Sequence, residues 1–163
     1  MTVGEPWQRV GVTGHQDLPD SVASLVLTKL NAWFPTAHHT WVICSLAQGA
    51  DTFVAAHLLE RGAKLRVIVP SNNYETSFAT ATAKATYSQL LDRADEVEVL
   101  GYPEPNEEAY MAAGALVAKD SDWLIAIWDG KKARGLGGTG DVVALARSYG
   151  KDVRVIWPTG VER

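Results

Sequence analysis

The stretch from residue 123 to residue 149 constrains the fold more than any other part of the sequence. It opens with WLIAIW, an apolar run rich in β-branched and aromatic side chains, which is typical of a strand buried on both faces. Asp129 ends the run, and a glycine-rich loop follows. The glycines of this loop are Gly135, Gly137, Gly138 and Gly140. Asp141 then opens a segment with helical apolar spacing, so the sequence predicts a strand, a loop and a helix in succession.

A glycine-rich loop that leads into a helix is a ready site for an anion, because unpaired backbone N–H groups and the helix dipole point at the ligand. Glycine also lets the backbone approach a ligand closely. The spacing here matches neither the Walker A phosphate loop nor the dinucleotide-binding fingerprint. We expect the amides of residues 137–140 to bind a phosphate, with the Thr139 hydroxyl as a further donor; the alternative is a flexible surface loop.

Strand-like and helix-like segments alternate along the whole chain. Strands are predicted at residues 9–14, 40–45, 65–69, 96–100, 123–128 and 153–157. Helices are predicted from residues 19–21 to about 33, at 52–61, 78–93 and 107–119, and from 141 onward, with Asn106 as an N-cap. This alternation predicts an α/β, three-layer Rossmann-like fold, in which a mostly parallel sheet has helices on both faces. The length of 163 residues predicts one domain over residues 1–163.

Polar turns follow three of the predicted strands. Because the carboxyl ends of parallel strands meet at one edge of the sheet, where such folds bind ligands, these turns are expected to form one site. The candidate ligand-binding residues are Thr13, Gly14, His15, Gln16, Ser45, Gln48, Gly49, Asp51, Asp129, Gly137, Gly138, Thr139, Gly140 and Asp141. Among them, Gln48 carries the groups needed to read a base or ribose edge.

Three of these residues, His15, Asp51 and Asp141, are also catalytic candidates. An imidazole can act as acid, base or donor near neutral pH, but His15 is equally explained as a turn histidine that hydrogen-bonds backbone. Asp51 and Asp141 suit a ribose hydroxyl, or they cap the helices that follow them. Asp129 suits a ribose or base amine, or it only ends its strand.

Other reactive side chains have ordinary explanations. Lys131, Lys132 and Arg134 either neutralise a phosphate or form a solvated charge cluster. His57 is expected to be partly buried with satisfied hydrogen bonds, and Cys44 to be a buried, inert thiol. With no second cysteine and no zinc motif, the sequence predicts no metal site.

Charge and hydropathy limit the expected partners. The net charge is −4 with no Lys/Arg cluster, which argues against duplex nucleic acid, and the basic balance of a single-strand DNA protein is missing. No apolar stretch reaches the ~18 residues that span a membrane, and residues 1–9 lack the apolar core of a signal peptide, so a cytoplasmic location is expected. We therefore expect a small-molecule, nucleotide-like ligand, with no duplex nucleic acid and no membrane partner.

Three motifs together resemble the SLOG superfamily: GVTGH at residues 11–15, QGAD at 48–51 and GGTGD at 137–141. This superfamily includes the LOG phosphoribohydrolases, which are similar to lysine decarboxylases, the DNA-processing protein A domain and nucleotide-sensing domains. The resemblance covers most of the chain. It implies a Rossmann-like fold, a site for a nucleotide or nucleotide-derived ligand with the glycine loop at its phosphate, and a homo-oligomer.

The enzymatic branch of this family can be tested residue by residue. The LOG motif Pro-Gly-Gly-X-Gly-Thr-X-X-Glu, aligned on Gly138 and Thr139, places its catalytic glutamate at Val142. The family's catalytic arginine aligns near Ala113, and residues 107–119 contain no arginine. Both catalytic positions hold apolar residues, which argues against hydrolysis of the LOG type.

We therefore predict a protein that binds a nucleotide or related phosphorylated small molecule, with no required cofactor but a possible bound nucleotide. One alternative is a nucleoside-phosphate N-glycosidase in which Asp51 or Asp141 stabilises an oxocarbenium-like sugar or positions water. A second alternative is a carrier of a bulky phosphorylated cofactor, such as the molybdenum cofactor. A third is a structural or interaction domain, for which the six tryptophans would supply the surface.

Overall fold

Six parallel strands form one sheet in the order β4-β3-β2-β1-β5-β6. The computed structural model describes residues 4–132 and 135–163. The strands are β1 (Gln8–Gly14), β2 (Thr40–Cys44), β3 (Lys64–Ser71), β4 (Glu96–Tyr102), β5 (Trp123–Ile127) and β6 (Asp152–Ile156). The helices are α1 (Asp20–Trp33), α2 (Ala50–Glu60), α3 (Ala81–Asp92), α4 (Glu107–Asp120) and α5 (Thr139–Ser148), with a short 3₁₀ turn η1 (Tyr74–Ser77).

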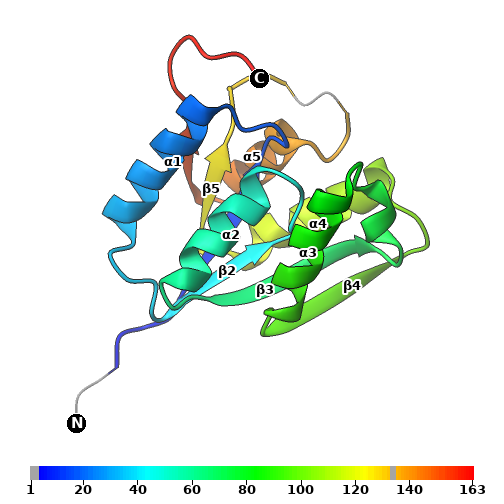
Figure 1. Cartoon of the computed structure of the whole chain (residues 1–163), viewed down its shortest axis with the longest axis horizontal. Helices are drawn as coiled ribbons and strands as arrows, with labels where there is room; N and C mark the ends of the chain where they lie inside the picture. Colours follow the sequence, from blue (N-terminus) through cyan, green and yellow to red (C-terminus); the bar gives the residue numbers. More distant parts are fainter. Residues whose placement is uncertain (1–3, 133–134) are drawn as a thin grey trace.

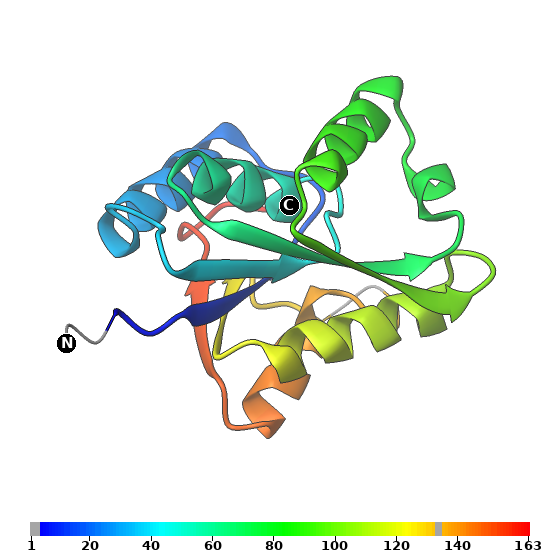
Figure 2. The same cartoon turned by 90° about the horizontal axis from the view of Figure 1, so that it is seen from below.

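The helices cover both faces of the sheet, as the sequence predicted. Figure 2 shows α1, α2 and α3 on one face and α4 and α5 on the other. The chain steps outward from β1 to β4 and then returns to the far side of β1 with β5. Right-handed crossovers in opposite directions place their helices on opposite faces. Because the chain changes direction across the sheet in this way, the strand order reverses between β1 and β5. Folds of this class bind ligands at such a point.

The middle of the sheet is apolar on both faces because each central strand is covered twice. Ile125 and Ile127 of β5 face the core under α1 and α2, while Leu124 and Ala126 face the core under α4 and α5. All four side chains are fully buried. This confirms the buried strand predicted in this stretch, although it ends at Ile127, one residue early.

Several predicted strand boundaries were wrong. β3 does not stop before Pro70 but runs on to Ser71, since a register irregularity between Val69 and Ser71 accommodates a residue that has no N–H to donate. β4 likewise extends two residues beyond the predicted end, to Tyr102.

The third helix also begins later than predicted. α3 starts at Ala81, because the side chain of Thr80 accepts a hydrogen bond from the Ala83 N–H and caps the helix (3.1 Å). Phe78, the predicted first residue, instead packs beside Tyr74 of η1. α2 and α5 each begin two residues earlier than predicted, at Ala50 and Thr139.

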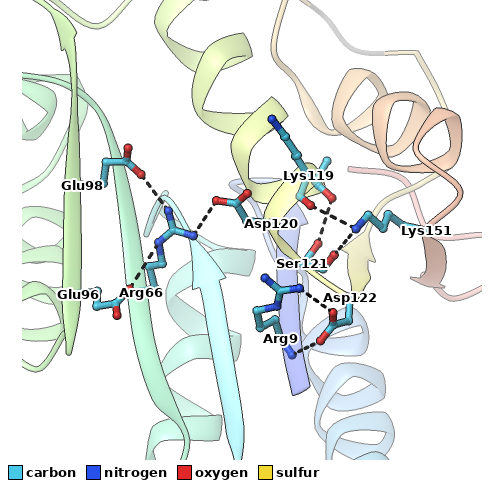
Figure 3. A network of polar contacts seen from close by, with 10 residues as sticks. Arg9, Arg66, Glu96, Glu98, Lys119, Asp120, Ser121, Asp122 and Lys151 are labelled. Atoms are coloured by element: carbon cyan, nitrogen blue, oxygen red, sulfur yellow. Dashed lines mark hydrogen bonds and ion pairs between the residues drawn. The ribbon is translucent and has the colours of Figure 1, made fainter. Parts of the chain in front are cut away.

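The two ends of α4 are fixed by polar contacts. Asn106 caps its start, as predicted, by accepting from the Ala109 N–H (2.8 Å). At its end, Arg66 of β3 bonds Asp120 at 2.7 Å and also Glu98 of β4 at 2.9 Å (Figure 3). The Arg66 contacts hold the last turn of α4 against the amino-terminal parts of β3 and β4.

Two further contacts in Figure 3 join α4 to the rest of the sheet. Arg9 of β1 pairs with Asp122, just before β5 (3.0 Å). The Lys151 ammonium donates to the carbonyl oxygens of Lys119 and Ser121. No helix among the described residues is long and apolar enough to cross a membrane.

Candidate functional site

A cavity of about 560 Å³ lies where the carboxyl ends of β1 and β2 meet the loop into α5. Its walls come from the two strand ends, the start of α2, η1, the first half of α4 and the residues before α5. Its position adjoins the strand-order reversal between β1 and β5. The volume is that of a typical small-molecule site.

Most of the predicted ligand-binding residues line this cavity. They are Thr13, Gly14, His15, Gln16, Ser45, Gln48, Asp51, Gly137, Gly138 and Thr139. The other four, Gly49, Asp129, Gly140 and Asp141, are not part of the lining. The convergence of three turns is therefore a property of the fold, while contact with a ligand stays a prediction.

Gly49 lies outside the lining because the first two turns pack backbone against backbone. Its φ angle is +90°, and a side chain here would collide with the carbonyl groups of His15 and Gln16. The Ala50 N–H donates to the carbonyl oxygen of His15 across the same contact (3.1 Å). Gly49 thus joins the two turns to each other.

The glycine loop leaves only part of its backbone for a ligand. Gly137 has φ +82°, and a Cβ there would lie 2.6 Å from the backbone nitrogen of Met111, so this glycine allows close contact with α4. Its N–H donates to the Asp141 carboxylate (3.0 Å). Asp141 therefore closes the loop before α5 by accepting from an amide four residues earlier, and it does not cap the helix. Among the described residues, the N–H groups of Thr139 and Gly140 have no hydrogen-bond partner and remain for an anion.

Asp51 makes the same contact with a loop amide before its helix, without capping α2, and it also lines the cavity. Its Oδ2 accepts from the Ala47 N–H, four residues earlier, at 3.2 Å. Burial raises the pKa of Asp51 from an ordinary 3.8 to about 7, against the opposing effect of hydrogen bonds from the backbone of Ala47 and Ser45. Near neutral pH this carboxyl can therefore donate or accept a hydrogen bond, a property common at functional sites.

The His15 ring lies between the Asp129 carboxylate and the Arg163 guanidinium. Its Nε2 is 3.2 Å from Oδ1 of Asp129, and its Nδ1 is 3.2 Å from Nη1 of Arg163. Burial alone would raise the pKa of Asp129, but the backbone N–H of Lys131 and the charges of His15 and Arg163 lower it. Asp129 thus stays an anion inside the protein. The Nε2 of His15 also accepts from the backbone N–H of Asp129 (3.1 Å), so His15 hydrogen-bonds backbone, as one of the two interpretations predicted, in addition to its contacts with the two charged side chains.

Arg163 is a site residue that the sequence analysis missed. The chain folds back after β6 because the Trp157 ring meets His15 edge-on (5.3 Å between centroids) and its Nε1–H donates to the Val161 carbonyl (2.8 Å). Figure 1 shows the C-terminal end of the chain beside the loop between β5 and α5. Nothing in the local sequence signals this long-range contact.

The aromatic wall of the cavity was also missed. Tyr74 and Phe78 lie 5.2 Å apart between ring centroids, and Tyr110 of α4 lies 6.5 Å from Tyr74. All three line the cavity. They come from three separate segments, so only the tertiary fold brings them together.

The two positions aligned with LOG catalytic residues also lie on the cavity wall. Ala113 and Val142 both line it, beside Gly114, whose Cβ would lie 2.6 Å from Val142 Cγ2. This wall has no charged group where the LOG enzymes have a carboxylate and a guanidinium.

The remaining sequence candidates are not part of the cavity. Lys131 and Lys132 are exposed and do not line it, and Arg134 lies outside the described residues. His57 is bonded to Asn31 and Arg61, as predicted. Cys44 is fully buried, as predicted, and burial raises the pKa of its thiol.

Two solved structures share this fold, and both are of DNA processing protein A (DprA). The X-ray structure from Streptococcus pneumoniae matches with a TM-score of 0.73 and 19% identity, over 96% of this chain and 52% of that one. The protein from Helicobacter pylori, described for its unique single-stranded DNA binding mode, matches with a TM-score of 0.68 and 15% identity, over 94% and 67%. The chain thus spans about half the length of the first neighbour. No protein-family model and no curated protein matches the sequence.

The comparison confirms the predicted fold and corrects one prediction. The Rossmann-like α/β architecture is that of DNA processing protein A, which the sequence resemblance had named. The expectation of a small-molecule partner without nucleic acid was wrong, because a neighbour with this fold is described as binding single-stranded DNA. The net charge of the whole chain does not exclude an anionic ligand, since a site can be built from backbone amides and a single cation.

Proposed function

We propose that the cavity binds a nucleotide unit, either as a free nucleotide or as part of single-stranded nucleic acid. One observation carries this proposal: a single cavity joins an anion-accepting helix start, two polar strand ends and an aromatic wall. These three surfaces suit the phosphate, the sugar and the base. The resemblance to the SLOG superfamily and the fold of the DprA neighbours support the same ligand class.

The phosphate is assigned to the start of α5. The N–H groups of Thr139 and Gly140 lie in its first turn without partners among the described residues. Gly138 precedes them in an extended conformation (φ −71°, ψ 175°) and caps the helix without a side chain. Bare amides at a helix start attract anions through both hydrogen bonding and the helix dipole.

The base is assigned to the opposite wall. Tyr74, Phe78 and Tyr110 present aromatic surface beside apolar Val142 and Ala113. Stacking of a base on an aromatic ring stabilises binding by about 1–3 kcal/mol. Between the two walls, Gln48 and Asp51 supply polar groups that suit sugar hydroxyls and base edges.

The Gly138→Asp variant tests the phosphate position. An aspartate is a favoured N-cap, so its carboxylate should accept from the first-turn amides and occupy the anion position without unfolding α5. Calorimetric titration should show AMP and a short single-stranded oligodeoxynucleotide binding to the wild type, and at least tenfold weaker binding to the variant at an unchanged melting temperature.

The matched control is Gly4→Asp, which adds the same charge at an exposed glycine with nothing within 4 Å of the new Cβ. It should bind as the wild type does. If neither ligand binds the wild type, or if Gly138→Asp binds both as tightly, the proposed site is wrong. Binding of the oligonucleotide alone would assign the polymer as the ligand, and binding of AMP alone would assign the free nucleotide.

A further inference from the structure

The segment after β6 adds a cation to a cavity that is otherwise acidic. The titratable carboxyl groups of the lining are those of Asp17, Asp51 and Glu107. Among the described lining residues, Arg163 is the only lysine or arginine. The guanidinium of Arg163 is therefore the place in this lining where a cationic side chain can attract an anion.

The Arg163 side chain is held in position by buried partners. Its side chain is 16% exposed, and its Nε lies 3.1 Å from Oδ2 of Asp129, which is 2% exposed. Its Nη1 lies 3.2 Å from the Nδ1 of His15, and its Nη2 lies 3.4 Å from the Lys132 carbonyl oxygen. Contacts from three sides fix the guanidinium at the cavity wall.

The hydrogen-bonding capacity of this cluster is not fully used. Arg163 Nε and Asp129 Oδ2 form an ion pair at 3.1 Å, so these two buried atoms satisfy each other. A guanidinium has five N–H donors, and the contacts above use one N–H on each of its three nitrogens. Among the described residues, one N–H on Nη1 and one on Nη2 are therefore left for a polar ligand in the cavity.

We propose that Arg163 is the residue that makes the cavity select phosphorylated over unphosphorylated nucleosides. The proposal rests on nucleotide binding by this cavity. Arg163 donates charge-assisted hydrogen bonds to a phosphate oxygen, in addition to the amides at the start of α5. An unphosphorylated nucleoside makes the same contacts with the aromatic wall but gains nothing from the guanidinium.

Titration calorimetry with AMP and adenosine tests this selectivity. The wild type should bind AMP more tightly than adenosine, and Arg163→Gln should weaken AMP roughly ten- to a hundredfold while adenosine binding stays within about threefold. Arg163→Lys, which keeps the positive charge beside Asp129, should lie between the two. Arg147→Gln removes an equal charge from the exposed face of α5 and should leave both affinities unchanged.

The outcomes separate this inference from the proposed function. If the wild type binds AMP but Arg163→Gln keeps its preference for AMP over adenosine, the role of Arg163 is wrong while nucleotide binding stands. If the wild type binds neither compound, both are wrong. Should Arg163→Gln fail to fold, the lysine variant decides. Weaker AMP binding with adenosine binding unchanged supports the role of Arg163 in binding the phosphate, and an equal loss of AMP and adenosine binding overturns it.

Discussion

At the scale of single residues, Asp51 is the group whose chemistry the fold changes most. Its pKa rises from 3.8 to about 7 by burial, so the folded protein keeps a proton that the unfolded chain releases between about pH 4 and pH 7. Stability attributable to Asp51 is therefore lost as the pH rises through this range, and the loss is complete above about pH 7. Above that pH, a buried charge destabilises the native state.

Asp51→Asn mimics the protonated form and keeps an oxygen that accepts from the Ala47 N–H. We expect the variant to be more stable than the wild type at pH 8, by up to about 4 kcal/mol, and to differ little at pH 4. Urea denaturation at both pH values measures this. Asp92→Asn, at an exposed position on α3, should show no such change. An equal difference between Asp51→Asn and the wild type at both pH values would contradict the raised pKa.

At the same scale, the sequence predicted where polar groups would gather but not what each would do. Asp51 and Asp141 had two interpretations each, and both accept from a backbone amide four residues earlier. Only burial distinguishes them, because Asp51 faces the cavity. The burial of Asp51 and the cavity beside it depend on the tertiary fold, so residue type and spacing could not distinguish the two aspartates.

At the scale of secondary structure, Arg66 joins β3, β4 and α4, and a single substitution tests all of its ion pairs together. Its side chain, 22% exposed, lies 2.7 Å from Asp120 of α4 and 2.9 and 3.8 Å from Glu98 and Glu96 of β4. Replacing it by methionine keeps much of the apolar stem but leaves three carboxylates without a counter-charge.

We expect Arg66→Met to lower the free energy of unfolding by roughly 1–2 kcal/mol, a modest value because these pairs are partly exposed to solvent. Hydrogen exchange should speed up along β4, and added salt should reduce the loss of stability by screening the carboxylates. Arg147→Met on α5 serves as the control. Unchanged exchange in β4 would show that Arg66 does not hold this strand.

The elements themselves were predictable where local chemistry decides them. The apolar run of β5 and the Asn106 cap of α4 each depend on a few neighbouring residues. The errors fall where tertiary contacts override local signals: β3 continues through Pro70 at a register irregularity, and Phe78 packs into the aromatic cluster rather than beginning a helix.

At the scale of the whole molecule, the alternation of strands and helices was enough to predict the fold. Given the strand order, right-handed crossovers determine on which face each helix lies, and the position of the cavity follows from the reversal between β1 and β5. The tail after β6 was not predictable, because its contacts with His15 and Asp129 are made across the molecule. The net charge of the whole chain likewise does not predict a site that consists of a few backbone and side-chain groups.

Nucleotide binding at the carboxyl ends of the strands is the central claim, and titration of AMP into ¹⁵N-labelled protein, followed by amide chemical shifts, tests it most directly. We predict the largest shifts at residues 13–16, 47–51 and 137–140, with little change at the amino ends of the strands, near Trp41 and Lys64. Absence of shifts at millimolar AMP, or shifts gathered at those amino ends, would contradict the claim.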